Sequence, residues 1–413
     1  MSSAVVPAVS VRRTLPFLGP AFIAAIAYVD PGNFATNFGA GARFGYALLW
    51  VIVAANLMAM LIQALSAKLG LATGADLATL CRRHLGPGVS FVLWIQAEVV
   101  AIATDLAEVV GGALALNLLF GLPLALGGVL TAAAAFLLLL LQSRGFRPFE
   151  AVITVLLLVI ATSFGYLVLR ANPDLAGAVD GLRPDFAGTE SVVLATGILG
   201  ATVMPHVIYV HSALTPGRYT ALRPGMPTTG RREALRAQRI DLFIAMGLAG
   251  LINGSMLLIA ARLFSERSGG AIDTLPGVHA GLLAALGSGA ALAFGLALLA
   301  SGLASSSVGT YAGQVVMAGF LGRQIPVLVR RLVTVLPALV VLLIGVDPTR
   351  ALVWSQVVLS FGIPFALVPL VWLTSRADLM GELVNRRRTT AVACVVVALV
   401  VALNGFLIVD LAL

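Results

Sequence analysis

The amino-acid sequence predicts an all-α polytopic membrane protein with eleven membrane-crossing segments. Of its 413 residues, 60% are hydrophobic and only 11% are charged. A soluble domain usually carries about 25% charged residues. Soluble enzymes, nucleic-acid-binding proteins and disordered scaffolds therefore fit this composition poorly. The apolar residues form continuous runs instead of the alternating pattern of membrane β-barrel strands.

The predicted spans follow from length, because a helix of about 20 apolar residues crosses a bilayer. The stretches that meet this condition are 17–41, 46–69, 89–119, 122–142, 150–171, 192–216, 240–264, 281–319, 326–345, 349–373 and 388–411. The longest polar connections lie near 172–190, 217–239 and 265–280. We therefore expect residues 1–413 to form a single integral membrane domain. The first apolar run continues past any cleavage site, which favours a retained helix over a signal peptide.

The basic residues predict the orientation of the chain. The formal net charge is +8, and 20 of the 26 Lys and Arg residues fall on the side of the N-terminus if all eleven segments cross. Basic residues are enriched in cytoplasmic loops. We expect a multi-pass protein of the cell membrane with a cytoplasmic N-terminus and an extracytoplasmic C-terminus. The membrane topology then explains the excess of basic residues, and no nucleic-acid partner is expected.

Two predicted spans are interrupted by polar and helix-breaking residues. The first contains Asp-Pro-Gly-Asn at 30–33, and the sixth contains Met-Pro-His at 204–206. Proline removes a backbone donor and glycine favours unwinding, and freed carbonyls at membrane depth must face a cavity or protein. Interrupted helices in corresponding positions of two inverted halves are typical of transporter binding sites. The alternative is that each proline only kinks its helix.

The two interruptions carry groups that suit a divalent transition metal. Asp30 offers a carboxylate that is costly at membrane depth without a partner or a task, and Asn33 lies one helical turn away. The other interruption offers the Met204 thioether and unwound carbonyls such as that of Ala201. Sulfur is a poor ligand for Mg²⁺ and Ca²⁺ but is tolerated by Mn²⁺ and Fe²⁺ and suits Cd²⁺. The alternative for Met204 is ordinary core packing.

A second polar set in segment 89–119 suggests a proton relay. Asp105 and Glu108 share one helix face, and two such carboxylates in a low dielectric favour retention of a proton on one of them. Further candidates are Glu98 on the same segment, His206 and His211 in the sixth span, and Arg331 as a counter-charge. A structural salt-bridge network is the alternative.

Other polar residues allow more than one interpretation. Gln356 could supply an amide ligand in one conformation and Asn253 could hydrogen-bond within the polar core, but both could equally hold helices together. The stretch SGLASSSVGTYAG at 301–313 predicts close helix packing. His84 and His279 are expected in solvated loops.

Several motifs resemble one family. DPGNFATN at 30–37, TDLAE at 104–108 and GATVMPHVIYVHSAL at 200–214 resemble the Nramp/MntH family of proton-coupled divalent metal transporters. The similarity continues through AGLIN at 249–253, AGQVVM at 312–317 and SQVVLSFGIPFALVPL at 355–370. It covers nearly the whole chain. The absence of a twelfth span and of a long outer loop suits a bacterial member.

The resemblance implies a LeuT-type fold with discontinuous helices 1 and 6, in which two inverted five-helix repeats (17–171 and 192–373) are followed by an extra helix at 388–411. It implies the metal ligands Asp30, Asn33, Met204 and the Ala201 carbonyl, joined by Gln356 in some states. It implies a proton pathway through Asp30, His206, Asp105 and Glu108, supported by Glu98, His211 and Arg331. The residues that would shape the site or its gates are Thr202, Asn253, Pro31, Gly32 and Pro205.

The functional prediction is import of Mn²⁺, Fe²⁺ and also Cd²⁺ by proton symport and alternating access. The partners expected are these ions, protons and the lipid bilayer, with no permanently bound cofactor and a monomeric chain. Three alternatives are a membrane metalloenzyme, an amino-acid transporter of the same fold and a passive metal channel. The chain has four histidines but no HExxH motif for the first, and a carboxylate in the break disfavours the second. No Walker A motif is present for ATP.

Overall fold

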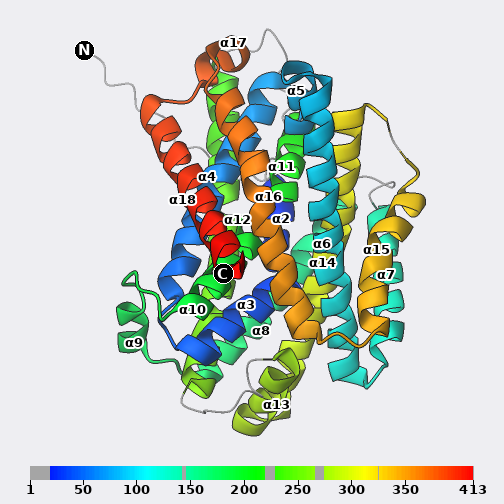
Figure 1. The fold of residues 1–413 in the computed structure, drawn as a ribbon, viewed down its shortest axis with the longest axis vertical. Helices are drawn as coiled ribbons and strands as arrows, with labels where there is room; N and C mark the ends of the chain where they lie inside the picture. The colour runs from blue at the N-terminus through cyan, green and yellow to red at the C-terminus, as the bar shows by residue number, and fades with distance from the viewer. Residues whose placement is uncertain (1–18, 142–145, 219–227, 266–273, 324, 413) are drawn as a thin grey trace.

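The computed structural model describes residues 19–141, 146–218, 228–265, 274–323 and 325–412. In these residues the chain is a bundle of α-helices (Figure 1). The first part of the chain forms α2 (Pro20–Ala27), α3 (Pro31–Phe44), α4 (Leu49–Thr73), α5 (Leu77–His84), α6 (Gly86–Phe120), α7 (Leu124–Leu140) and α8 (Phe146–Ala171). The middle forms α9 (Leu175–Asp180), α10 (Thr189–Thr202), α11 (Pro205–Arg218) and α12 (Thr228–Phe264). The last part forms α13 (Leu275–Leu286), α14 (Ser288–Leu321), α15 (Val327–Leu343), α16 (Pro348–Thr374), α17 (Ala377–Met380), η4 (Gly381–Leu383) and α18 (Arg387–Ala412).

All eleven predicted segments coincide with helices of this bundle. Within the described ranges, eight helical stretches are long and apolar enough to cross a membrane, and one of them is the broken helix α10–α11. The segments predicted at 122–142 and 326–345 correspond to α7 and α15, which have 17 residues each. The segment predicted at 17–41 is divided between α2 and α3. The chain is thus a multi-pass α-helical membrane protein.

The structure corrects the sequence prediction where glycines and caps divide helices. The segment predicted at 281–319 is two helices, because Gly287 has a φ of 91° and ends α13 before α14 begins. Short helices α5 and α9 lie in connections for which no helix was predicted, and α13 begins in the connection near 265–280. His84 ends α5, and His279 lies half-buried in α13 with its ring 6.2 Å from that of Phe294. The prediction of loops for both histidines was therefore wrong.

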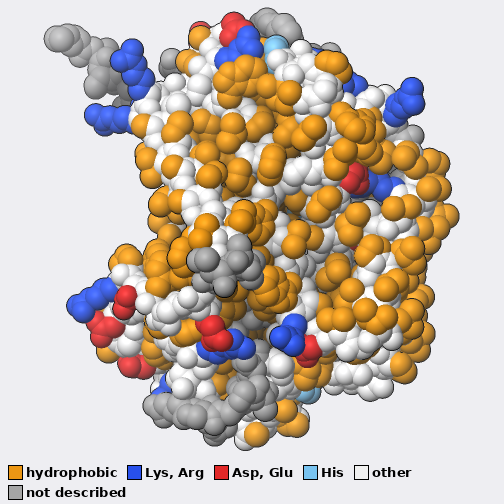
Figure 2. Space-filling model, in the orientation of Figure 1, with side chains coloured by type: hydrophobic (Ala, Val, Ile, Leu, Met, Phe, Trp, Pro, Cys, Tyr) orange, Lys and Arg blue, Asp and Glu red, His pale blue; other side chains and the backbone are white. Residues whose placement is uncertain are grey.

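The exterior of the bundle is apolar. Hydrophobic side chains spread over the middle of the face seen in Figure 2, whereas Lys, Arg, Asp and Glu gather mainly toward its two ends. Leu57, Leu169 and Leu251 are among the exposed aliphatic side chains. Such a large apolar exterior is what a lipid-facing surface requires. Arg12 and Arg13, which contribute to the predicted orientation, lie outside the described residues.

Candidate transport site

The first break lies between α2 and α3. After Ala27 the chain leaves the helix, and Asp30 then takes up an extended conformation as the N-cap of α3. Its carboxylate accepts a hydrogen bond from the backbone N–H of Asn33 at 2.8 Å. Pro31 follows at the first helical position, where its missing N–H costs nothing. The Asp-Pro-Gly-Asn sequence therefore restarts a helix inside the bundle, with its charged cap buried.

The unwound carbonyls of the first break are held by neighbouring helices. Asn253 on α12 donates from Nδ2 to the Tyr28 carbonyl at 2.7 Å. Ser301 on α14 donates from Oγ to the Val29 carbonyl at 2.6 Å. Asn37 on α3 in turn donates to Asn253 Oδ1 at 3.0 Å. These contacts satisfy backbone groups that lipid could not, as a break at this depth requires.

The second break lies between α10 and α11. The helix α10 ends at Thr202, and α11 begins at Pro205. The residues between and around them are buried, including Met204 and His206. In Figure 1, α3 and α10 lie in the lower half of the bundle, and α2 and α11 lie in the upper half. Both broken helices thus change direction near the middle of the bundle.

Side chains from three helices converge where the breaks meet. Asn33 Nδ2 donates to Asp30 Oδ1 at 2.7 Å and to the Ala201 carbonyl at 3.1 Å. Gln356 on α16 donates from Nε2 to the other carboxylate oxygen of Asp30 at 3.3 Å. The structure therefore brings together four of the five residues predicted to bind metal. Met204 is buried two residues beyond Thr202, and its carbonyl accepts a hydrogen bond from the backbone N–H of Val207 at 3.2 Å.

Several buried oxygens where the two breaks meet could accept further hydrogen bonds. Asn33 Oδ1, Gln356 Oε1 and Thr202 Oγ1 are buried without a hydrogen-bond partner among the described residues. Such atoms are rare in folded proteins, and each one calls for an explanation. A half-turn of either terminal amide exchanges its nitrogen for its oxygen. Asp30 and both amides could then present oxygen to a cation.

Two glycines, at positions 32 and 200, bring α16 against the breaks. Neither was predicted to be a packing position. A Cβ at Gly32 would overlap the Gln356 side chain, and a Cβ at Gly200 would overlap the Gln356 carbonyl oxygen. Gly32 had been predicted to border the site, but Gly200 had not been noticed. The close approach at both positions requires residues without side chains.

A second polar cluster joins α6 to α14 and α15. Arg331 forms a 2.6 Å ion pair with Asp105 and donates to Thr310 Oγ1 at 2.7 Å and to Ser306 Oγ at 2.5 Å. Glu98 pairs at 3.0 Å with Arg330, which had not been predicted to take part. The guanidinium of Arg330 lies where a Cβ at position 313 would be. The stretch 301–313 therefore supplies hydrogen-bond partners as well as close packing.

Glu108 links this cluster to the first break. One of its oxygens, Oε2, is buried without a hydrogen-bond partner in the described part of the chain. Its carboxylate lies against Gly309, where a Cβ would approach both oxygens to 2.9 Å. One turn further along α6, Gly111 packs directly on Pro31. The predicted relay carboxylates thus stand on the helix that borders the metal-site candidates.

The two predicted histidines belong to different surroundings. His206 Nδ1 lies 3.3 Å from Thr104 Oγ1, beside Asp105 in sequence. His211 Nδ1 lies 2.8 Å from Gln63 Oε1, and Gln63 donates to the Tyr28 hydroxyl at 2.5 Å. His211 is therefore part of a polar chain that leads to Tyr28 at the end of α2. Gln63 and Tyr28 had not been predicted, because neither has a sequence signal of its own.

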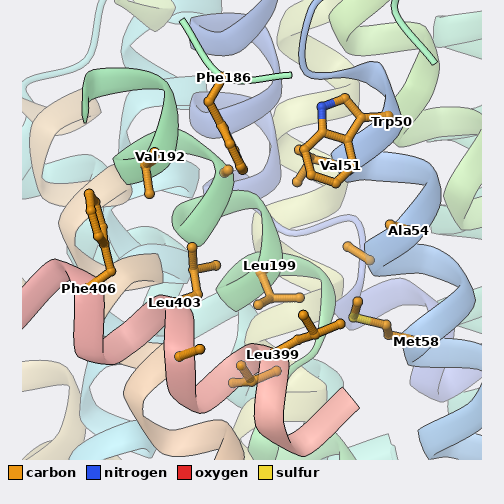
Figure 3. A pocket seen from close by; sticks show the side chains of 14 residues that line it. Trp50, Val51, Ala54, Met58, Phe186, Val192, Leu199, Leu399, Leu403 and Phe406 are labelled. Carbon is orange, nitrogen blue, oxygen red and sulfur yellow. The ribbon is translucent and has the colours of Figure 1, made fainter. Parts of the chain in front are cut away.

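Two cavities differ in character. One, of about 450 Å³, is an apolar groove between α4, α10 and α18, with Trp50 and Phe186 at one end and Phe406 on α18 (Figure 3). The other, of about 520 Å³, is lined by polar and charged groups that include Arg43, Glu190 and Arg350. This second cavity follows α3 as far as Ala35. It approaches the convergence point, whereas the groove in Figure 3 contains none of the predicted site residues.

Buried polar groups where two broken helices of a polytopic α-helical protein meet are typical of membrane transporters. The closed conformation of Mhp1, a nucleobase-cation-symport-1 family transporter, matches with a TM-score of 0.55 over 89% of this chain and 81% of that one. At 14% identity this likeness supports the fold alone. The chain belongs to the Nramp family, because the natural resistance-associated macrophage protein-like family model matches residues 21–410.

Curated relatives and solved structures agree with this assignment. The chain is 52% identical to the divalent metal cation transporter MntH of Deinococcus radiodurans over 97% of this chain and 91% of that protein. It is 51% identical to the MntH protein of Bacillus subtilis over 97% and 93%. A variant of the Eremococcus coleocola manganese transporter matches with a TM-score of 0.86 at 33% identity, over 98% and 88%. The protein is thus a member of a transporter family and not an enzyme.

Proposed function

We propose that this protein imports divalent transition metal ions, Mn²⁺ first and also Fe²⁺ and Cd²⁺, by symport with protons. The observation that carries the proposal is the convergence of Asp30, Asn33, the Ala201 carbonyl and Gln356 at the meeting point of two helix breaks. The names of the MntH relatives and of the manganese transporter support a divalent cation as cargo.

The proposed ligand set explains how a single charged ligand could bind the cation. Within the described residues, no three His, Cys, Asp or Glu side chains form a metal cluster. Asp30 would therefore be the only charged ligand, and Asn33, Ala201 and Gln356 would add neutral oxygens. Met204, beside the second break, would add sulfur, which favours Mn²⁺, Fe²⁺ and Cd²⁺ over Mg²⁺ and Ca²⁺. A site with few fixed charges would also bind the ion weakly enough to release it.

The amide of Asn33 has a particular role in this proposal. It donates to both Asp30 Oδ1 and the Ala201 carbonyl, so it lies between two oxygens that would otherwise face each other. A cation between these oxygens would replace the amide hydrogens, and the turned amide would present Oδ1 as a further ligand. Pro31, Gly32, Thr202 and Pro205 shape the breaks around it.

Protons would leave the site along α6. The proposed route runs from Asp30 or His206 to Glu108 and Asp105. The Asp105–Arg331 and Glu98–Arg330 ion pairs support it by setting the charge balance of the buried cluster. His211 would contribute from the cytoplasmic half of α11. The unpartnered oxygen of Glu108 supports a carboxyl group that can change its protonation.

Alternating access would involve eleven crossing helices in two inverted repeats, at 17–171 and 192–373, with 388–411 outside them. The N-terminus would be cytoplasmic and the C-terminus extracytoplasmic, in the cell membrane. The charged cavity beside α3 would then be the outer approach to Asp30. Asn253, which holds the Tyr28 carbonyl and meets Asn37, would contribute to closing that side.

The test of the cargo site is Mn²⁺ uptake into proteoliposomes by the Asp30→Ala variant. Asp174→Ala is a matched control, because Asp174 also caps a helix and accepts from the i+3 backbone N–H, of Gly177 at 3.1 Å, but at the exposed start of α9. We expect uptake to be lost in the first variant and kept in the second. Uptake that survives Asp30→Ala would overturn the assignment.

Proton coupling is tested in the same vesicles with an internal pH indicator. A symporter acidifies the interior when Mn²⁺ is added, and an inward proton gradient drives Mn²⁺ above its equilibrium level. A passive metal channel does neither. Mn²⁺ uptake without acidification would leave metal transport standing and remove the proton coupling.

A further inference from the structure

The amino end of α2 is capped by a residue from a distant part of the sequence. Asp241 on α12 accepts hydrogen bonds from the backbone N–H groups of Gly19 at 3.1 Å and Ala21 at 3.0 Å. Gly19 itself provides no side-chain cap, and it has a φ of 143°. Helices usually take such a cap from their own N-terminal residue. Here a carboxylate more than 200 residues away has that role.

This contact is a charged interaction in a buried place. Asp241 is 1% exposed. A buried carboxylate is costly unless it is well hydrogen-bonded, and bonds from backbone N–H groups at a helix amino end are both charge-assisted and favoured by the helix dipole. The cap therefore fixes the position of the α2 amino end relative to α12.

The short helix α2 depends on such tertiary contacts. It has eight residues, and isolated helices shorter than about 12 residues are marginal in water. The same helix α12 also holds its other end, through Asn253 and the Tyr28 carbonyl at 2.7 Å. Asp30, the proposed cargo ligand, follows two residues later. A movement of α2 away from α12 would therefore break the Asp241 cap at one end and reposition the site at the other.

We propose that Asp241 is a positioning residue of the transport cycle, whose cap holds α2 closed against α12 and must break for the cargo to leave on the N-terminal side. This inference rests on the proposed transport function and adds a residue outside the predicted cargo and proton pathways. Loss of the cap would favour the state in which α2 has moved away. Asp241 would act through α2 and would not contact the ion.

The experiment measures the accessibility of α2 without metal. A single cysteine replaces Ala24, which is completely buried in α2, in a chain in which Cys81 and Cys394, both free, are changed to alanine. A charged, membrane-impermeant thiol reagent then labels the protein in proteoliposomes. Removal of a helix cap changes an equilibrium by about 2- to 30-fold. We expect Asp241→Ala to raise the labelling rate by a factor in this range, and Asp241→Asn, which keeps one acceptor oxygen, to raise it less.

The control is Asp174→Ala. Asp174 also accepts from two backbone N–H groups with its two carboxylate oxygens, from Ala176 at 3.0 Å and Gly177 at 3.1 Å, but it caps the short helix α9 within its own sequence. We expect no change in Ala24→Cys labelling for this variant. A second perturbation, Gly19→Ala, strains the same cap from the α2 side, because a φ of 143° disfavours residues other than glycine.

The possible results separate this inference from the proposed function. Faster labelling in Asp241→Ala and Gly19→Ala, but not in Asp174→Ala, supports the cap as a closing contact. Unchanged labelling in both cap variants, with normal folding shown by a single size-exclusion peak, overturns it. Because the assay contains no metal, it gives the same answer whether or not Mn²⁺ uptake is observed. Failure of uptake in the unmodified protein would instead count against the proposed function.

Discussion

The contact between Gly32 and Gln356 leads to a quantitative prediction about the cargo site. A Cβ at position 32 would overlap the Nε2, Cδ and Cγ atoms of Gln356. These atoms belong to a flexible side chain, so Gln356 can move aside, but it would then lose its 3.3 Å contact with Asp30. Alanine at this position does not disturb the helix, because it has a higher helix propensity than glycine. Gly32→Ala should therefore act on the site more than on the fold.

The expected size of the effect follows from the displacement of Gln356, whose turned amide would present its oxygen to the ion in the proposed site. A contact between a polar group and a charge, such as a hydrogen bond to a charged group, contributes about 1.5–3 kcal/mol, which corresponds to about 10- to 150-fold in an equilibrium constant. We expect the Gly32→Ala variant to need about 10- to 150-fold more Mn²⁺ for half-maximal uptake. The assay is initial-rate uptake in proteoliposomes over a range of Mn²⁺ concentrations.

A double-mutant comparison shows whether Gly32 acts through Gln356. Gln356→Ala removes the side chain that the new methyl group would meet. If the reasoning holds, Gly32→Ala should add almost nothing in the Gln356→Ala background. Gly247→Ala on α12 is the control, because a Cβ there meets no atom within 4 Å. Equal losses in both backgrounds would refute the mechanism.

Two further predictions concern the proposed sulfur ligand and the buried ion pair. Met204→Ala should weaken discrimination against Ca²⁺ and Mg²⁺ more than it weakens Mn²⁺ uptake, because it removes the proposed soft ligand; continued full exclusion of Ca²⁺ in competition assays would contradict this. Arg331→Leu should lower stability by about 3–5 kcal/mol, because it leaves Asp105 buried without its partner. Thermal unfolding in detergent should show that the Asp105→Leu/Arg331→Leu pair recovers part of this loss, and no recovery would argue against a direct coupling.

Much of the fold could be predicted because membrane-crossing helices have a strong sequence signal. Each of the eleven apolar segments coincides with helices in the structure. The boundaries were less predictable where a single residue decides them. Gly287 ends α13 through its positive φ, and nothing in the apolar composition of 281–319 distinguishes it from the glycines inside α14. Short helices in the connections are likewise too brief to have a clear periodicity.

The candidate site could be predicted where its residues are unusual for a membrane-crossing helix. Asp30 stands out because a carboxylate at membrane depth is costly, and Pro205 because it interrupts an apolar helix. Gln63 and Tyr28 are not unusual in such helices, since amides and phenols are common between packed helices. Their relation to His211 depends on how α4, α2 and α11 pack. Gly200 was missed for the same reason, because its function is to admit the backbone of α16.

The way in which the breaks are held bears on how the site can change state. The first broken helix is attached to unbroken neighbours by separate polar contacts, from Asp241 and Asn253 on α12 and from Ser301 on α14. A typical hydrogen bond contributes about 0.5–1.5 kcal/mol net, and more when one partner is charged. Together these contacts contribute a few kcal/mol to holding α2 in place. Binding of a cation or a proton at Asp30 shifts such an equilibrium if its affinity for the two states differs by a comparable amount. In the proposed transport cycle, a single carboxylate at the junction of the breaks is both the ligand and the switch, because its charge would be compensated in one state by amide donors and in the other by the ion.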